Sequence, residues 1–481
     1  MIALGAVQLE ALLVGLALAT LLGDAFWPTL NKRSLGLGLA ALVTLVLFYS
    51  FTLSAETTTH FHGMYRLDPL ALYFKRLFLV ATLMVLVMGA EFVGRFESGV
   101  AEFYALVLLA ATGMLLTASV NDFILMFVAL ELITITFYVL TSFLRRQVQS
   151  LEAGTKYLIL GALASGFTVY GIAYIFGTTG TTNFDTLAVT LAKGTPGAAF
   201  TLGMLLVMTG LGFKIASVPF QIWAPDVYQG APTPVTAFLA VGSKAAGFAL
   251  LLRVLLVGLL PVSALWTWLL VVLAAATLLY GNLGALPQTN IKRLMGYSSI
   301  GHAGYMLMGI AAVNALGAGA VLFYLGQYAV TNLCAFLAII AVTNVTKTDE
   351  ISGFAGLGRR SPLLGLALFA ALMSLAGVPP LSGFFGKFQL FAAVIERAAT
   401  DWHYYVLAGV GAVAVVISLY FYLNVARAIY LAEPTDVTPI PVSGPVRVAL
   451  WVCLVAIIGL GIFQRPLVEA AVKAATVFQL K

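Results

Sequence analysis

The chain has 481 residues, of which 61% are hydrophobic and only 9% are charged, whereas soluble domains carry about 25% charged residues. This composition excludes an ordinary soluble protein and indicates an all-α polytopic membrane protein. The net charge of +6 comes from basic residues scattered singly or in pairs, which argues against a surface that binds nucleic acid.

A membrane-spanning helix needs about 20 apolar residues, and we count fourteen candidate spans. The first is expected to remain as a helix, because residues 1–26 lack a basic start and contain Glu10 and Asp24, unlike a cleavable signal peptide. In chain order the candidates lie near residues 5–25, 35–53, 72–92, 103–119, 122–143, 155–177, 198–221, 232–256, 262–283, 293–313, 317–345, 361–396, 404–430 and 446–464.

Two candidate spans are expected to be broken inside the membrane. The seventh carries Lys214 five residues before Pro219, and the twelfth is too long for one helix and contains the glycine- and proline-rich segment 377–383. Unwound backbone at membrane depth is tolerated only where it faces protein or a water-filled cavity. Interrupted helices in corresponding positions are typical of transporters built from inverted repeats.

The breaks are five spans apart, which predicts two five-helix repeats, the second inverted because each repeat has an odd number of helices. The predicted organisation is residues 1–100 for spans 1–3, 101–257 for the first repeat (spans 4–8), 258–431 for the second repeat (spans 9–13) and 432–481 for span 14.

Basic residues are more frequent in the loops on one side of these spans, and the positive-inside rule then places both chain termini on the outer side. The predicted cytoplasmic set is Lys32, Arg33, Arg95, Arg145, Arg146, Lys292, Arg293, Lys347, Arg359, Arg360 and Arg447. The opposite set is Arg66, Lys193, Arg397, Arg465, Lys473 and Lys481.

Three lysines, Lys214, Lys244 and Lys387, lie deep inside predicted spans, and Glu131 and His302 lie at similar depth. A charge at the centre of a bilayer costs about 2.5–3.5 kcal/mol on insertion scales. Ionisable groups that are kept at this cost usually mark an ion or proton path.

Lys214 is the predicted partner of Glu131. Burial lowers the pKa of a lysine and raises that of a carboxylic acid, while a nearby opposite charge reverses both shifts. A movable Glu–Lys pair can therefore act as a proton switch. The alternative is a static ion pair that fixes the register of two helices.

Lys244 lies about ten residues from either end of its span, roughly 15 Å of helix, which is too far for its side chain to reach the interface. Lys387 follows the predicted break in the twelfth span. The alternative for Lys387 is a lysine that stabilises free carbonyls at a helix end.

His302 belongs to a polar stripe with Tyr297, Ser298 and Tyr305 on an otherwise apolar helix. Histidine titrates near pH 6.5, which suits a proton relay, although a hydrogen-bonded core histidine has the same pattern. Lys156 and Lys292, near span ends, are either inlet residues or ordinary flanking charges. The acidic residues Glu10, Asp24 and Glu102 are predicted to be interfacial.

Known cofactor patterns are missing. The two cysteines, Cys334 and Cys453, are too few for an iron–sulfur cluster, which needs about four thiolates. The sequence has no zinc spacing and neither of the glycine-rich nucleotide motifs. The expectation is that this chain binds no nucleotide and no redox metal, so that any energy it uses comes from elsewhere.

Three long motifs stand out: VPFQIWAPDVYQGAPTPVTAFLAVGSKAAGF from Val218 to Phe248, TNIKRLMGYSSIGHAGYMLMG from Thr289, and LAGVPPLSGFFGKFQLF from Leu375. They resemble the subunit N family of respiratory complex I, the bacterial NADH-quinone oxidoreductase. The resemblance runs over essentially the whole chain. It implies an antiporter-like subunit with fourteen helices, two inverted repeats, broken helices 7 and 12, and no cofactor of its own.

By position, the resemblance implies roles for the buried residues. Glu131 and Lys214 resemble a coupled pair, Lys156 an inlet lysine, and Lys244 a central connecting lysine. His302 and Lys292 continue the axis, and Lys387 resembles the terminal lysine of the second half-channel. A lysine there is typical of subunit N, whereas subunit M has glutamate. One departure is Gln221, where histidine is usual, which removes support for a relay at that position.

The resemblance further implies a proton-pumping subunit of a bacterial inner-membrane complex, with no redox chemistry in this chain. Antiporter-like subunit M and small subunits of the K and J types would be its partners. NADH, FMN, iron–sulfur clusters and quinone would be bound by other subunits. Two alternatives remain: a subunit of a cation/proton antiporter or membrane hydrogenase with the same fold, and a membrane scaffold that does not pump.

Overall fold

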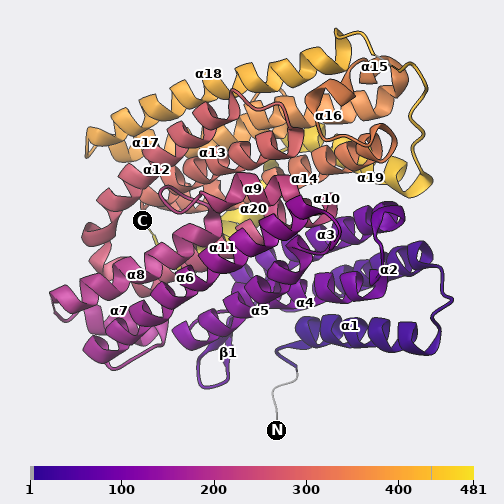
Figure 1. The fold of residues 1–481 in the computed structure, drawn as a ribbon. Coiled ribbons are helices and arrows are strands. Elements are labelled where there is room, and N and C mark those ends of the chain that lie inside the picture. The colour runs from indigo at the N-terminus through magenta and orange to yellow at the C-terminus, as the bar shows by residue number, and fades with distance from the viewer. Residues whose placement is uncertain (1–4, 195, 435, 481) are drawn as a thin grey trace.

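A computed structural model describes residues 5–194, 196–434 and 436–480, and Lys481 of the predicted outer set therefore lies outside the described residues. The chain is a bundle of long helices (Figure 1). In the described part, the only strands form a small antiparallel hairpin of β1 (Thr58–His60) and β2 (Tyr65–Leu67) between the second and third helices.

The first half of the chain forms the helices that carry predicted spans 1–8. They are α1 (Gln8–Phe26), α2 (Lys32–Ser50), α3 (Pro69–Phe92), η1 (Val93–Arg95), α4 (Val100–Ala118), α5 (Phe123–Thr141), α6 (Val148–Thr179), α7 (Phe184–Leu191), α8 (Ala198–Ile215), α9 (Trp223–Gly230), α10 (Thr233–Phe238), η2 (Leu239–Ser243), α11 (Lys244–Arg253) and η3 (Val254–Gly258).

The second half carries predicted spans 9–14. Its helices are η4 (Leu260–Val262), α12 (Ser263–Ala285), α13 (Ile291–Ala311), α14 (Ala315–Thr346), η5 (Ile351–Phe354), α15 (Leu357–Arg360), α16 (Pro362–Ala376), α17 (Ser382–Ala398), α18 (His403–Tyr430), α19 (Gly444–Ile462), α20 (Arg465–Ala475) and η6 (Thr476–Phe478).

The predicted spans all occur as helices. Within the described residues, 12 helices are long and apolar enough to cross a membrane. The remaining two predicted spans are α13, which begins with the charged pair Lys292–Arg293, and the pair α16 and α17, whose first helix is short. The predicted fold class, an all-α polytopic membrane protein, is confirmed. The repeat boundaries stay a prediction.

The break in the seventh span is confirmed, although its second half extends to Gly230, beyond the predicted end at residue 221. The α8 helix ends at Ile215, and Ala216 has a left-handed backbone, with φ of 57°. Polar groups of the break find partners, as a buried chain requires. The Trp223 indole donates to the Phe213 carbonyl at 3.0 Å, and the Val218 amide donates to Thr277 Oγ1 at 3.0 Å.

The twelfth span is also broken as predicted, between Ala376 at the end of α16 and Ser382 at the start of α17. Gly377 ends α16 with φ of 92°, a left-handed conformation that favours glycine. The Ser374 hydroxyl accepts a hydrogen bond from the Gly383 amide at 3.1 Å, which joins the two halves across the break.

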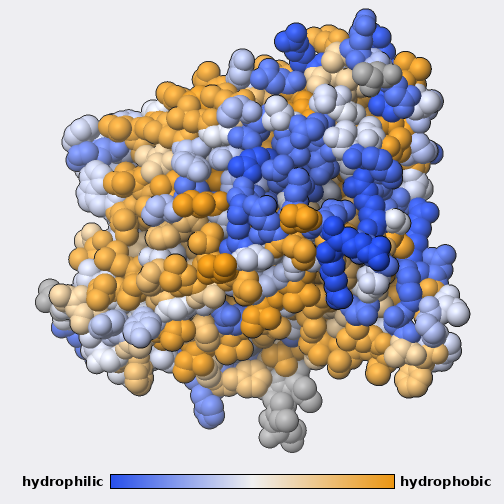
Figure 2. Space-filling view, in the orientation of Figure 1, coloured by the Kyte–Doolittle hydropathy of each residue, from blue (hydrophilic) through white to orange (hydrophobic). Residues whose placement is uncertain are grey.

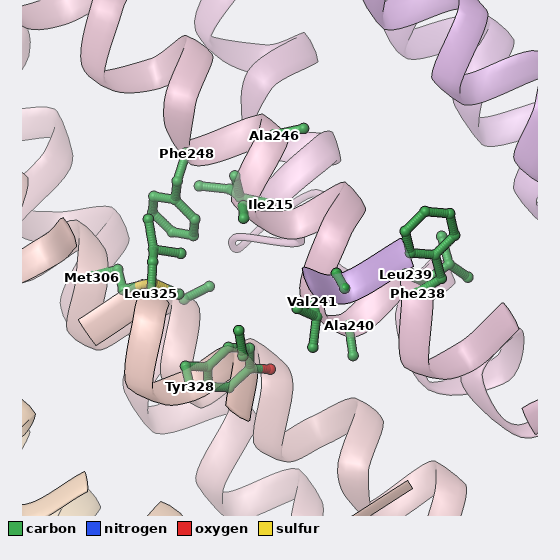
Figure 3. Packing of buried hydrophobic residues seen from close by; sticks show 14 of the residues in the cluster. Ile215, Phe238, Leu239, Ala240, Val241, Ala246, Phe248, Met306, Leu325 and Tyr328 are labelled. Carbon is green, nitrogen blue, oxygen red and sulfur yellow. The ribbon is translucent and has the colours of Figure 1, made fainter. Parts of the chain in front are cut away.

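The centre of the molecule is the span that contains Lys244. Every residue from Thr233 to Leu256 is buried. Two π-helical turns, η2 and η3, flank the α11 helix, and such turns often occur at functional sites. Figure 3 shows apolar side chains of this span, such as Val241 and Phe248, beside Ile215 of α8 and Tyr328 of α14.

The surface suits a lipid or protein environment. Large hydrophobic side chains are exposed on the outer helices, including Val416 and Tyr420 of α18 and Val452 and Val455 of α19. Figure 2 shows mostly hydrophobic residues on the left of this face, while hydrophilic residues gather across its right half. The helix ends at the right of Figure 1 include the turn from α1 to α2, which carries Lys32 and Arg33 of the predicted cytoplasmic set.

The sequence predicts that Glu10 is interfacial, but the structure buries this residue inside the helix bundle. It is 4% exposed, and its Oε1 accepts a hydrogen bond from the Lys75 ammonium at 2.7 Å. The Tyr65 hydroxyl donates to the same oxygen at 3.1 Å. The packing of α1 against α4 and of β2 beside α3 creates this buried pair, which spacing along the chain does not encode.

Candidate functional site

Glu131 of α5 and Lys214 of α8 share a small cavity but do not form a direct ion pair. Glu131 accepts a hydrogen bond from the Ser165 hydroxyl of α6, and the Lys214 ammonium donates to Thr134 Oγ1 at 3.1 Å. Thr134 lies three residues after Glu131, on the same face of the helix. The cavity has a volume of about 20 Å³, and one water needs about 10–15 Å³.

The geometry therefore corrects the predicted pair in one respect. The two charges are neighbours along one cavity wall, each held by a hydroxyl rather than by the other. Glu131 is half-buried, while Lys214 is 4% exposed. Both side chains line the same cavity, so no direct ion pair fixes the two helices in the way that the static alternative requires.

Lys244 lies at the start of α11, directly after the η2 turn, and is 2% exposed. Its ammonium donates to the Ser299 carbonyl of α13 at 2.7 Å and to the Ile215 carbonyl at 3.2 Å. Ile215 is the last residue of α8, where a helix leaves carbonyls without an intrahelical partner. Lys244 thus connects the break in the seventh span with α13, the helix that carries His302.

His302 lies between two tyrosines of the second half. Its Nδ1 is 2.6 Å from the Tyr324 hydroxyl of α14, and its Nε2 is 3.2 Å from the Tyr422 hydroxyl of α18. The Tyr422 hydroxyl also hydrogen-bonds to Ser298, one turn before His302. Two members of the predicted polar stripe, Ser298 and His302, therefore share one hydrogen-bond partner, Tyr422. Tyr305 instead donates to the Gly411 carbonyl at 3.1 Å.

Lys387 of α17 is 4% exposed and donates to the Ala376 carbonyl at 2.8 Å. Ala376 is the last residue of α16, so Lys387 stabilises a helix end, as the alternative from the sequence has it. The ammonium also lies 4.8 Å from the centre of the Tyr305 ring, a favourable cation–π distance. The Tyr305 ring is in turn 6.2 Å from the His302 ring.

These contacts form one line of polar groups across the molecule. It runs from Glu131 and Lys214 through Lys244 to the His302 cluster and then to Lys387. Between His302 and Lys387 no direct hydrogen bond exists, and the ring of Tyr305 lies between them. The structure thus links, through intervening polar and aromatic groups, a predicted pair and three residues that the sequence predicts separately.

Lys156 and Lys292 lie further along their helices, about 13–15 Å by helical rise from Ser165 and His302, respectively. Lys156 is half-exposed and pairs with Asp226 of α9 and Glu152, each at 2.6 Å. Lys292 is buried and pairs with Asp349 at 3.2 Å. Arg293 also binds Asp226, at 2.5 Å, so these charges form a separate cluster. Their proposed transport roles stay predictions.

Several residues of the line are missing from the sequence interpretation: Thr134, Ser165, Ser299, Tyr324 and Tyr422. Hydroxyl-bearing side chains are common in membrane helices, where many only hydrogen-bond to their own backbone. Tyr324 could have been found from the sequence, because Tyr324, Gln327 and Tyr328 form a polar group within the apolar α14.

The described residues contain no group of three or more His, Cys, Asp or Glu side chains that could hold a metal ion. The two free cysteines, Cys334 and Cys453, are both buried. The titratable side chains along the polar line are those of lysine, glutamate, histidine and tyrosine.

Comparison with known proteins identifies the family of this chain. A family profile described as NADH:quinone oxidoreductase/Mrp antiporter, transmembrane, matches residues 120–418. A protein named NADH-quinone oxidoreductase subunit N from Heliobacterium modesticaldum is 42% identical, over 90% of each chain. The chain belongs to the subunit N family. This confirms the resemblance drawn from the three motifs.

Solved structures agree with this family. A chain of respiratory complex I from Thermus thermophilus with bound aureothin is 34% identical and has a TM-score of 0.80, with 96% of this chain and 98% of that chain covered. A chain of the Mrp complex from Dietzia sp. has a TM-score of 0.84 at 24% identity, with 98% and 97% covered. The subunit N fold is therefore shared with the Mrp chain, and the fold by itself does not decide the function.

Proposed function

We propose that this chain is a proton-translocating membrane subunit of an NADH-quinone oxidoreductase. Membership of the subunit N family supports the assignment to that complex. The observation that carries the proton path is the line of ionisable residues, in which Lys214 lies in the last turn before one helix break and Lys244 and Lys387 bind carbonyls at the two breaks. Ionisable groups at membrane depth usually belong to substrate paths.

Protons are proposed to enter the line at Glu131 and Lys214, where the shared cavity has room for a water. Lys244 receives the charge next, because it binds the carbonyl of Ile215, which directly follows Lys214 in the chain. Protonation of one lysine then disfavours protonation of its neighbour through like-charge repulsion. This repulsion is the means by which charge moves forward.

His302 and its tyrosines are proposed to connect Lys244 with Lys387. Ser299, whose carbonyl binds Lys244, is adjacent in sequence to Ser298, whose hydroxyl binds Tyr422. A proton on either His302 nitrogen has a tyrosine oxygen within hydrogen-bonding distance. Lys387 ends the line at the second helix break. Lys156 is proposed as an inlet group upstream of Glu131 and Lys214, and Lys292 as an extension of the central axis.

The direct test uses the assembled complex in proteoliposomes, with quinone reduction and pH-gradient formation measured together. Lys244→Met removes the central charge while keeping the length of the side chain. Normal assembly with lost pumping supports the proton path and excludes the scaffold alternative. Normal pumping in this variant overturns it. Sodium/proton exchange by the isolated chain, without an electron donor, would favour the antiporter alternative instead.

The electron carriers are proposed to lie outside this chain. NADH, FMN, iron–sulfur clusters and quinone belong to other subunits, and subunits of the M, K and J types are the proposed membrane neighbours. Mass spectrometry of the complex purified in mild detergent tests this composition. Co-purification of sodium/proton antiporter subunits alone would contradict it.

The proposed location is the bacterial inner membrane, with both termini on the outer side. Arg145 and Arg146 are exposed in the loop between α5 and α6, on the proposed cytoplasmic side. Labelling of cysteines placed in this loop by a membrane-impermeant maleimide tests the orientation. If these loop cysteines are labelled in whole cells without permeabilisation, the loop lies on the outer side and the proposed orientation is reversed.

A further inference from the structure

A groove outside the proton line lies between α3, α14 and α20, close to the end of α2. Its volume is about 340 Å³, and apolar side chains such as Leu77 of α3, Val330 of α14 and Leu467 of α20 form most of its wall. The Tyr73 hydroxyl donates to the Leu322 carbonyl at 2.6 Å and holds α3 against α14. This hydrogen bond fixes the relative position of the two helices that form the groove.

Two cations, Arg76 and Lys473, line this groove, and none of its lining residues is acidic. Neither cation pairs with a carboxylate within the described residues. One Arg76 nitrogen, Nη2, donates to the Ser50 carbonyl at 3.0 Å. Its Nε is buried and has no hydrogen-bond partner in the structure.

An unpaired guanidinium nitrogen in an apolar setting is unfavourable, because a buried donor without a partner costs about 1–3 kcal/mol. The guanidinium also lies 4.4 Å from the centre of the Phe51 ring, which fixes its direction. Arg76 is seven residues after Pro69, the first residue of α3, or about 10 Å along the helix. A cation at this depth is suited to bind a lipid headgroup. The groove wall further along α3 is apolar.

We propose that the groove binds one anionic phospholipid. The phosphate would accept hydrogen bonds from Arg76 and Lys473, and one acyl chain would lie against Leu77, Val80 and Val330. Arginine pairs readily with phosphate oxygens, and basic pockets between membrane helices are typical sites for anionic headgroups. A zwitterionic lipid would bring a second positive group beside two cations and is disfavoured.

The helix α20 gives the groove its outer wall. Ala471 and Ala474 are buried against the bundle, while Val472 and Lys473 are exposed. Such an amphipathic helix can lie in the plane of the membrane interface. Lys473 is then on the groove side at headgroup level, which explains why a cation lies among otherwise apolar lining residues.

The test measures phospholipid retained by the delipidated, assembled complex after incubation with dioleoylphosphatidylglycerol or dioleoylphosphatidylcholine and gel filtration. Native mass spectrometry counts the bound lipid. Wild type is expected to retain one more phosphatidylglycerol per chain than the Arg76→Gln/Lys473→Gln variant. The matched control, Arg145→Gln/Lys193→Gln, removes two exposed cations outside the groove and should retain the wild-type amount.

A second variant, Val330→Trp, keeps both cations and fills the apolar part of the groove. It should also lose the lipid, whereas Val345→Trp at an exposed position on the same helix should not. This variant keeps the proposal testable even if the double variant fails to assemble. Equal retention of phosphatidylglycerol by wild type and Val330→Trp, or equal retention of both lipids by wild type, overturns the proposal. A cysteine at Ala470 that cross-links to another subunit would also overturn it, since a partner helix would then fill the groove.

Discussion

Lys244 and Lys387 each bind the carbonyl oxygen of the residue that ends the first half of a broken helix. Lys244 binds Ile215 at the end of α8 at 3.2 Å, and Lys387 binds Ala376 at the end of α16 at 2.8 Å. A positive charge is stabilised at a helix C-terminus by the helix dipole and the free carbonyls. Charge on these lysines is thereby linked to the geometry of both breaks.

Glu131→Gln keeps the size of the side chain and its hydrogen bond to Ser165 but removes its charge. If Glu131 starts the proton line, the initial rate of proton pumping should fall about tenfold or more, as for loss of a general acid or base. Assembly should be normal. The measurement is pH-gradient formation in proteoliposomes at matched complex content. Glu396→Gln, which removes an exposed carboxylate of α17, is the control, and wild-type pumping in Glu131→Gln contradicts the role.

Lys244→Arg should impair pumping although it keeps a positive charge. Arginine does not lose its proton in proteins, so it can bind the Ile215 and Ser299 carbonyls but cannot pass a proton on. Pumping and quinone reduction should fall together if the two are tightly coupled. Full activity in an assembled Lys244→Arg complex would show that a fixed charge is sufficient there.

Lys387→Ala should abolish pumping through this subunit and also lower stability. The Ala376 carbonyl would lose its partner at a helix end, and an unsatisfied buried acceptor costs about 1–3 kcal/mol. Thermal unfolding of the purified complex measures the second effect. Lys193→Ala removes an exposed lysine outside the line and the groove and serves as the control for stability. Unchanged pumping with lowered stability would leave Lys387 with a structural role only.

Tyr324→Phe should lower pumping more than Tyr328→Phe. Both rings lie near His302, with centroids 5.9 and 5.1 Å away, but only the Tyr324 hydroxyl bonds to the imidazole. The Tyr328 hydroxyl is buried without a hydrogen-bond partner in the structure. The two variants remove the same atom at similar burial, so packing effects cancel. Equal pumping rates would exclude Tyr324 from the relay.

Gly383→Ala should destabilise the break in the twelfth span. An added Cβ would collide with the backbone carbonyl of Ser374, and overpacking of this kind typically costs about 1–3 kcal/mol. At Gly409 an added Cβ meets no atom within 4 Å, so Gly409→Ala should be neutral. The yield and melting temperature of the assembled complex measure the difference. A fully stable Gly383→Ala complex would show that the break can shift.

The spans and both breaks were predictable from the sequence because their causes are local. A run of apolar residues is sufficient to specify a membrane helix, and proline inside a helical segment removes a backbone hydrogen bond and clashes with the preceding turn. The buried lysines were predictable for the same reason, since a charge among apolar neighbours is visible without any knowledge of packing. The extension of α9 to Gly230 was missed because tertiary contacts determine how far a short helix continues.

Only the tertiary structure decided what each charge contacts. Glu131 and Lys214 are bound by separate hydroxyls, and His302 meets Tyr422, which is 120 residues away in the chain. Glu10 pairs with Lys75 across 65 residues. Hydrogen bonds need donor and acceptor within a few tenths of an ångström of an ideal distance, and such positions depend on how whole helices pack. The sequence by itself determined that ionisable groups are buried in the membrane, and packing determined how they are joined.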